Sequence, residues 1–169
     1  DDCKPLLAMG THLEITERKR AEAELIAQRE KAEKYLEIAG TAIIALDTKG
    51  YITLVNQRGQ EILGYESEEL LGRDWFEICL PQATQAKAKA RFDAVMAGRK
   101  EPSLKAESKV ITKGKKIRTI SWKNRVIYDE NKNITGYLTS GEDITLRKEV
   151  EAKLLEAQGH SFTLVENGE

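Results

Sequence analysis

Side chains that carry out covalent chemistry are few in this sequence, and they lie far apart. The histidines, His12 and His160, lie near the two ends, and the cysteines, Cys3 and Cys79, are separated by 75 intervening residues (79 minus 3, minus 1). Nucleophilic catalysis needs a base beside the nucleophile, and a zinc site needs several ligands at short spacings. The sequence contains no CxxC, HExxH or glycine-rich phosphate-binding motif. We therefore expect no catalytic residues and no metal site, and predict that the protein is not an enzyme.

Small polar and aromatic side chains favour a different chemistry, the noncovalent binding of a small molecule. Ligand pockets are mostly apolar and contain a few convergent polar atoms. If the strands bury the alternate residues that we expect, such groups lie together inside the fold. The predicted lining residues are Asn56, Trp75, Phe76, Ser108, Trp122, Asn124 and Ser140. The alternative is that helices fill this space and that Asn124 is an ordinary hydrogen-bonded core residue.

The composition indicates one domain with flanking helices and excludes several partners. A chain of 169 residues, 40% of them hydrophobic, can bury one ordinary core. Its 27 basic and 28 acidic residues nearly cancel, so we expect no nucleic acid or anionic membrane as a partner. The longest apolar runs, such as residues 42–46, are far shorter than the ~18 residues that suggest a membrane span. Two isolated cysteines fit a reducing, cytoplasmic compartment, although the parent protein could be membrane-anchored.

An internal repeat predicts that the chain is a piece of a longer protein built from repeated modules. Residues 15–25 recur as residues 144–154, with seven of the eleven positions identical. The offset of 129 residues (144 minus 15) corresponds to about one domain. We therefore expect residues 1–15 to be the poorly anchored remnant of a preceding module. The missing initiator methionine and the lack of a signal peptide agree with a fragment.

Residues 16–38 are predicted to form an amphipathic coiled-coil helix that leads into the domain. This segment has no Pro or Gly and is rich in Ala, Glu, Lys, Arg and Leu, which favour helices. Leu25, Ala32 and Leu36 fall close to a heptad pattern. We predict a homodimer through these three residues. The alternative is a solvated connector, because a seam this thin specifies a partner weakly.

The pattern from residue 39 to residue 145 predicts one α+β domain. Strands are expected at 43–47, 51–56, 103–112, 116–128 and 134–143, and helices at 57–63, 67–71 and 82–97. This order folds most simply as a five-stranded antiparallel sheet with helices on one face. In the fourth strand Ile120, Trp122, Val126 and Tyr128 are expected to share the buried face, with Asn124 as a polar exception. An exit helix at 146–158 and a tail at 159–169 complete the predicted organisation.

Three groups of residues resemble the signature of the PAS domain. The first is the segment 56–73, with Asn56, then Leu63-Gly64-Tyr65, then Glu69-Leu70-Leu71-Gly72-Arg73. The second is Ser121-Trp122-Lys123-Asn124, and the third is Gly136, Gly141 and Glu142-Asp143-Ile144-Thr145 with Arg147-Lys148. The resemblance covers about residues 35–150. It implies a PAS sensory and dimerisation module of a signal-transduction protein, such as a sensor histidine kinase of a two-component system.

The resemblance also implies a role for the junction between the last strand and the exit helix. The signal-transfer residues it implies are Asp143, Ile144, Thr145 and Arg147. Asp143 can accept the free N–H groups of the helix start, and Arg147 lies within ion-pair reach four residues on. The alternative is a plain helix cap. Adjacent PAS domains and an output domain, a histidine kinase or a diguanylate cyclase, are the expected partners within the parent chain.

The sequence lacks the residues that hold flavin or haem in known PAS relatives of the LOV and haem-binding types. Flavin photosensors of the LOV type use a cysteine within Asn-Cys-Arg-Phe, whereas Cys79 follows Ile78 and precedes Leu80. Haem-binding relatives use a histidine on the long helix, and residues 82–97 contain none. We expect no cofactor, or a noncovalent flavin or small metabolite, and do not expect haem b. Cys79 is interpreted as a buried hydrophobic residue, with a thiol sensor as the alternative. The alternative function is a purely structural dimerisation domain without a ligand.

Overall fold

The protein, studied as a computed structural model, is described for the backbone of residues 6–166 and the side chains of 13–36 and 38–157. It divides after Ile38 into two units. The first is helix α1 (Leu6–Ile38), which begins ten residues before the predicted start at residue 16. Leu, Ala and Met at positions 6–9 favour a helix, so the segment predicted as a loose remnant is helical from Leu6. Residues 1–5 of that predicted remnant lie outside the described residues.

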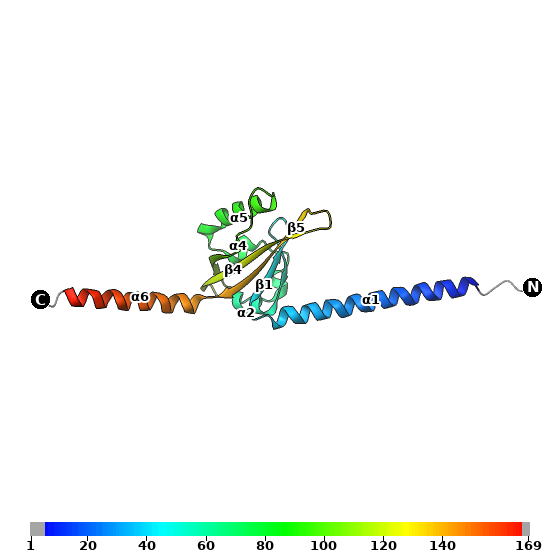
Figure 1. Cartoon of the computed structure of the whole chain (residues 1–169), viewed down its shortest axis with the longest axis horizontal. Helices are drawn as coiled ribbons and strands as arrows, with labels where there is room; N and C mark the ends of the chain where they lie inside the picture. The colour runs from blue at the N-terminus through cyan, green and yellow to red at the C-terminus, as the bar shows by residue number, and fades with distance from the viewer. Residues whose placement is uncertain (1–5, 167–169) are drawn as a thin grey trace, which may run out of the picture. The chain divides into compact units, whose positions relative to one another are not determined.

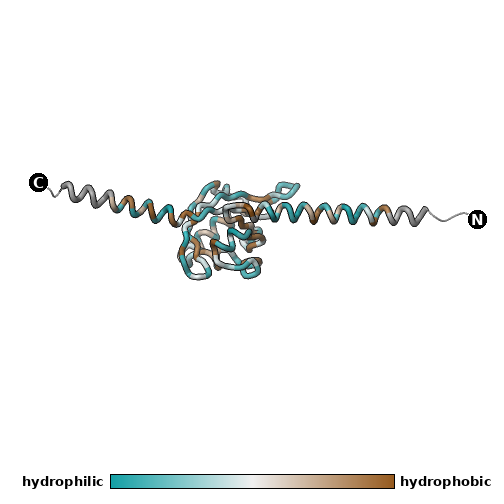
Figure 2. Tube along the Cα trace, turned by 90° about the horizontal axis from the view of Figure 1, so that it is seen from below, coloured by the Kyte–Doolittle hydropathy of each residue, from teal (hydrophilic) through white to brown (hydrophobic). Residues whose placement is uncertain are grey.

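Helix α1 exposes most of its described apolar side chains. Figure 2 shows hydrophobic positions interspersed among hydrophilic ones along this helix. Leu25 is 71% exposed and Ala32 is exposed, whereas Leu36 is partly buried. The dimer predicted through these residues therefore stays a prediction.

The second unit contains the predicted five-stranded antiparallel sheet (Figure 1). Its strands run in the order β2-β1-β5-β4-β3, so the last strand in sequence lies at the centre beside the first. Strand β5 pairs with β1 on one side and with β4 on the other. The strands are β1 (Ala42–Leu46), β2 (Ile52–Val55), β3 (Ala106–Ile111), β4 (Ile117–Tyr128) and β5 (Ile134–Asp143).

Four short or medium helices connect β2 to β3, and a fifth follows the sheet. They are α2 (Gln57–Leu63), α3 (Ser67–Leu70), α4 (Trp75–Cys79), α5 (Gln82–Met96) and α6 (Thr145–Glu166). Helix α4 was not predicted because five residues are too few to show a helical period. Asp74 starts it by accepting hydrogen bonds from the N–H groups of Phe76 at 2.8 Å and Glu77 at 3.4 Å. Helix α6 includes most of the segment predicted as a tail, and residues 167–169 lie outside the described residues.

The hydrophobic core lies between one face of the sheet and helices α2–α5. Ile44, Ile52, Leu63, Leu70 and Ile120 are its most deeply buried large side chains. In β4, Ile120, Trp122 and Asn124 face the core as predicted. Tyr128 does not, because the pairing of β4 with β5 becomes irregular after residue 127 and this side chain is 58% exposed. Within residues 6–166 we find no helix with the length and apolarity needed to span a membrane.

Candidate functional site

A cavity of about 500 Å³ opens between helices α4 and α5 and the inner face of the sheet. Its wall is strongly aromatic and includes both tryptophans of the chain. The rings of Trp75 and Trp122 meet edge to face at 5.6 Å, and Phe92 lies 5.2 Å from Phe76 and 5.5 Å from Tyr137. Aromatic pairs at these distances attract one another beyond their burial of surface. The cavity therefore has a wall that is already ordered, as ligand pockets usually have.

Five of the seven predicted lining residues reach this cavity: Trp75, Phe76, Ser108, Trp122 and Asn124. Asn56 does not. Its Oδ1 accepts the N–H groups of Ile43 at 2.8 Å and Gly59 at 3.0 Å, and its Nδ2 donates to the carbonyl of Thr41 at 3.0 Å. Asn56 is thus the N-cap of α2 and ties the start of that helix to β1.

Ser140 was placed on the wrong face of its strand. It pairs with Ile43 and Lys123, and side chains alternate along β5, so it is the neighbouring Thr139 that faces the cavity. The sequence around this position contains two pairs of similar neighbours, Tyr137-Leu138 and Thr139-Ser140. Neither phase of β5 is clearly more apolar, so the pattern alone could not choose between them.

The polar groups of the inner wall bond mainly to one another. Trp122 Nε1 donates to Ser108 Oγ at 2.9 Å. Asn124 Nδ2 donates to the carbonyl of Ser103 at 2.9 Å, while its Oδ1 accepts the hydroxyl of Thr139 at 2.8 Å. These bonds fix the wall and leave an interior that is predominantly apolar. Thr139 was missed by sequence reasoning because of the phase error in β5.

Arg91, on α5, lies at the cavity and was not predicted. Its guanidinium donates to the hydroxyl of Ser103. Tyr137, on β5, is partly buried, and this burial raises the pKa of its phenol, while the positive charge of Arg91 acts in the opposite direction. Arg91 and Tyr137 both line the cavity.

Cys79 is fully buried beneath this region, but it is not among the lining residues. Burial raises the pKa of its thiol to about 12. The thiol stays protonated at neutral pH, so it is a poor nucleophile. This agrees with the interpretation of Cys79 as a buried hydrophobic residue. In the described part of the chain, no group of three or more His, Cys, Asp or Glu side chains could hold a metal ion.

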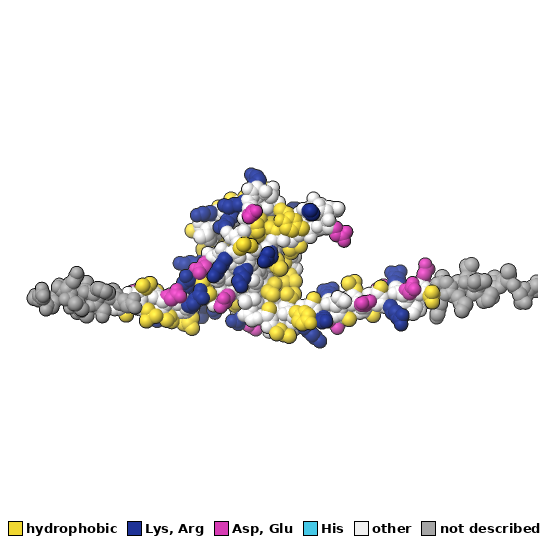
Figure 3. Space-filling view, in the orientation of Figure 1, with side chains coloured by type: hydrophobic (Ala, Val, Ile, Leu, Met, Phe, Trp, Pro, Cys, Tyr) yellow, Lys and Arg dark blue, Asp and Glu magenta, His cyan; other side chains and the backbone are white. Residues whose placement is uncertain are grey.

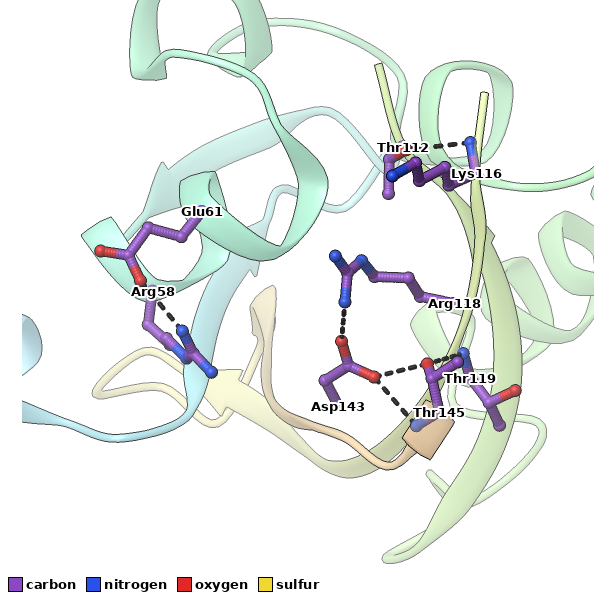
Figure 4. Close-up of polar contacts among 8 residues, drawn as sticks. All are labelled: Arg58, Glu61, Thr112, Lys116, Arg118, Thr119, Asp143 and Thr145. Atoms are coloured by element: carbon purple, nitrogen blue, oxygen red, sulfur yellow. Dashed lines mark hydrogen bonds and ion pairs between the residues drawn. The ribbon is translucent and has the colours of Figure 1, made fainter. Parts of the chain in front are cut away.

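A second cluster of polar side chains fixes the start of helix α6 to the sheet (Figure 4). Asp143 Oδ1 accepts the backbone N–H of Thr145 at 3.0 Å and its hydroxyl at 2.5 Å. The same hydroxyl oxygen accepts the N–H of Thr119, on β4, at 2.9 Å. Asp143 Oδ2 pairs with Arg118 Nη1, also on β4, at 2.5 Å. We call Arg118, Thr119, Asp143 and Thr145 the helix latch.

The contacts of the helix latch differ from the prediction for Arg147, and they include Arg118, which was not predicted. Arg147 does not pair with Asp143; its Nε lies 3.7 Å from Glu151 Oε1 on α6 itself. The cation beside Asp143 is Arg118, which could be found only once the register placed Ile120 opposite Asp143. Ile144 is buried, as a residue joining sheet and helix should be, and its N–H donates to the carbonyl of Thr119 at 2.9 Å.

The charge of Asp143 is stabilised by these contacts. Partial burial alone would raise the pKa of its carboxyl, but the hydrogen bonds from Thr145 and Arg118 outweigh burial and hold the pKa below its ordinary value. The latch is thus formed by a charged carboxylate at neutral pH. A further ion pair, Lys148 Nζ to Glu107 Oε2 at 2.9 Å, joins α6 to strand β3.

The cavity and the helix latch share strands β4 and β5. Trp122 pairs with Gly141 across these strands, and Asp143 follows two residues later. A Cβ atom on Gly141 would lie only 2.4 Å from Trp122 Cζ3. The indole therefore packs against the backbone of β5 immediately before the latch.

Comparisons with known proteins agree with this architecture. Residues 52–140 match a family described as the PAS fold. A PAS domain of an HTR-like protein from Haloarcula marismortui is 24% identical, with 75% of this chain and 99% of that chain covered and a TM-score of 0.60. A PAS domain from Colwellia psychrerythraea is 23% identical over 72% and 98% of the two chains, with a TM-score of 0.59.

A third similar structure contains a ligand. The PAS domain of the Cronobacter turicensis RpfR quorum-sensing receptor, in complex with BDSF, is 22% identical. The match covers 63% of this chain and 96% of that chain, with a TM-score of 0.53. No curated protein matches the sequence.

Proposed function

The chain belongs to the PAS fold family, and on this premise we propose that it is a non-catalytic sensory module that relays occupancy of its cavity to helix α6. PAS domains are sensory modules of signalling proteins. In this proposal α6 leads to an output domain of the parent protein, such as a histidine kinase or a diguanylate cyclase. The domain itself senses and transmits, and it carries out no reaction.

One observation carries this proposal: the same two strands form both the cavity wall and the helix latch. Trp122 and Asn124 of β4 and Thr139 of β5 line the cavity. Arg118 and Asp143, on the same strands, hold the start of α6. A ligand that shifts the indole of Trp122 presses on β5 at Gly141, and β5 continues directly into Asp143. Strands packed this closely transmit a displacement instead of absorbing it.

The proposed stimulus is a small molecule bound noncovalently. A cavity of about 500 Å³ is within the range of ligand pockets. Similar solved structures of the RpfR PAS domain hold BDSF and C12:0, which supports the idea that this fold can enclose such molecules. A noncovalent flavin or another small metabolite falls within the same proposal.

The relay can be tested by filling the cavity without a ligand. Ala88 is partly buried on α5 and lines the cavity, whereas Ala90 is exposed on the same helix and does not. We expect Ala88→Phe to change the hydrogen-exchange rate of the Thr119 amide, which donates to Thr145 in the latch. Ala90→Phe is the matched control and should leave that rate unchanged. Equal rates in the two variants would contradict the relay.

Dimerisation is the second candidate function, and exposed apolar side chains favour it. Leu146, Val150 and Leu154 repeat every four residues along α6 and are 74%, 48% and 59% exposed. Figure 3 shows hydrophobic side chains on this part of α6, between charged ones. We propose that α6 and α1, the latter through Leu25, pair with a second copy of the chain.

Sedimentation tests this second proposal directly. Leu154→Glu should shift the chain from dimer to monomer, because it puts a charge into the proposed apolar seam. Ala152→Glu, two residues away on a different face of α6, is the control and should leave the dimer intact. A wild-type chain that sediments as a monomer at high concentration would contradict the proposal.

A further inference from the structure

We infer that the ligand of this cavity is an amphipathic carboxylate whose apolar body fills the aromatic interior and whose carboxylate meets Arg91. This inference rests on the proposed sensory function and names the chemical class of its ligand. Three properties of the cavity carry it: the charges on its wall, the donors beside Arg91 and the size of its interior.

The charges on the cavity wall leave a net positive site. Its charged lining residues are Arg91, Glu107 and Lys109. Glu107 and Lys109 flank the inward-facing Ser108 on β3, so their side chains point to the other face of the sheet and Arg91 supplies the charge at the cavity. Glu107 is neutralised by Lys148 at 2.9 Å. Among the residues whose side chains are described, no carboxylate lies within ion-pair distance of Arg91 or Lys109. The wall therefore favours an anion over a neutral or cationic ligand.

The groups beside Arg91 suit a carboxylate. A guanidinium binds a carboxylate through two parallel hydrogen bonds. The hydroxyl of Ser103 contacts Arg91, and Tyr137 lines the same cavity. These hydrogen-bond donors come from different elements, α5, β5 and the segment before β3, and all three line the one cavity. One arginine with neutral donors matches a singly charged head better than a phosphate dianion, which usually recruits several cations.

The interior selects an apolar body. Trp75, Phe76, Phe92 and Trp122 line it, and the polar groups of Trp122 and Asn124 are already hydrogen-bonded within the protein. A polar body would find few free partners there. A cavity of about 150 Å³ holds one benzene molecule of six carbon atoms, so about 500 Å³ suits an apolar body of up to roughly 20 non-hydrogen atoms.

Tryptophan fluorescence gives a direct assay, because both tryptophans of the chain line the cavity. Decanoate, 1-decanol and decyl phosphate are titrated into the full chain below their micelle-forming concentrations. We expect decanoate to bind at least about 10-fold more tightly than 1-decanol and more tightly than decyl phosphate. Arg91→Gln should weaken decanoate binding about 10-fold and change 1-decanol binding less than about 2-fold.

Lys87→Gln is the control, because Lys87 is exposed on α5 and does not line the cavity. It removes the same charge from the same helix and should leave decanoate binding unchanged. Melting curves establish that both variants are folded. Equal binding of decanoate and 1-decanol, tighter binding of decyl phosphate, or no binding of decanoate would each overturn the inference. None of these outcomes touches the relay, which the comparison of Ala88→Phe with Ala90→Phe tests without any ligand.

Discussion

Replacing Gly141 by alanine tests how tightly the cavity wall is packed against strand β5. The added Cβ would lie 2.4 Å from Trp122 Cζ3, 2.6 Å from Trp122 Cε3 and 2.8 Å from Ile120 Cγ2. Carbon atoms pack at about 3.5–4.0 Å, so all three distances lie well inside the repulsive range. Both neighbours are buried, and neither can move into solvent. The indole must shift into the cavity, or β5 must move away from β4.

The expected cost follows from this geometry. Overpacking of a well-packed core destabilises a protein by about 1–3 kcal/mol. For a domain of this size, that loss corresponds to a fall in melting temperature of roughly 3–10 °C. The shifted indole should also change the tryptophan fluorescence, because Trp122 would lose its edge-to-face contact with Trp75 at 5.6 Å.

Urea unfolding and fluorescence measure both effects, with Gly114→Ala as the control. Gly114 has no left-handed backbone, and its added Cβ would meet its nearest atom at 3.9 Å. That variant should lie within about 0.5 kcal/mol of wild type. In a Trp122→Leu background, Gly141→Ala should cost less, because the clashing ring atoms are gone. Equal costs in the two backgrounds would refute this account of the wall.

Three further predictions concern the latch and the buried thiol. Asp143→Asn should lower the free energy of unfolding by about 1–3 kcal/mol at pH 7. The folded pKa of Asp143 lies below its ordinary value of 3.8. The difference in stability between wild type and Asp143→Asn should therefore persist above pH 3.8 and shrink as the pH falls through the folded pKa. Urea unfolding of both proteins from pH 3 to 7 measures this difference. Arg118→Met should increase hydrogen exchange at the Thr119 amide, whereas Arg147→Met, whose exposed partner is on its own helix, should not. The Cys79 thiol, with its pKa raised to about 12, should resist alkylation at pH 8 in the folded chain and react readily in 6 M guanidinium. Mass spectrometry measures the extent of alkylation. Rapid alkylation of the native chain would contradict the burial of Cys79.

Local signals made much of the sheet and of the helices predictable. The turns at residues 48–50, 113–114 and 129–133 separate β-rich runs, and these strands pair as an antiparallel sheet. The helix predicted at residues 57–63 ends where expected, because Gly64 follows it as the C-cap of α2 with φ of 76°. Such signals depend on neighbours in sequence, which is why they can be read without the structure.

Features that depend on contacts between distant residues were harder to predict. The pairing of Asp143 with Arg118 follows from the register of β4 against β5, and no pattern within either strand specifies that register. The mistaken choice of Ser140 over Thr139 arose because both are small and polar. Arg91 was not considered as a cavity residue, because a single arginine on an exposed helix usually lies in solvent.

The most direct test of the relay is a double-mutant cycle between the cavity and the helix latch. The measured quantity is the free energy of opening of the Lys148 amide, which donates to the carbonyl of Ile144 in the first turn of α6. It is compared among wild type, Ala88→Phe, Asp143→Asn and the double variant. Distant and independent sites add within about 0.5 kcal/mol. We predict a coupling energy clearly above that limit, because the latch is the connection through which the filled cavity acts on α6. Additive effects of the two substitutions would contradict the relay.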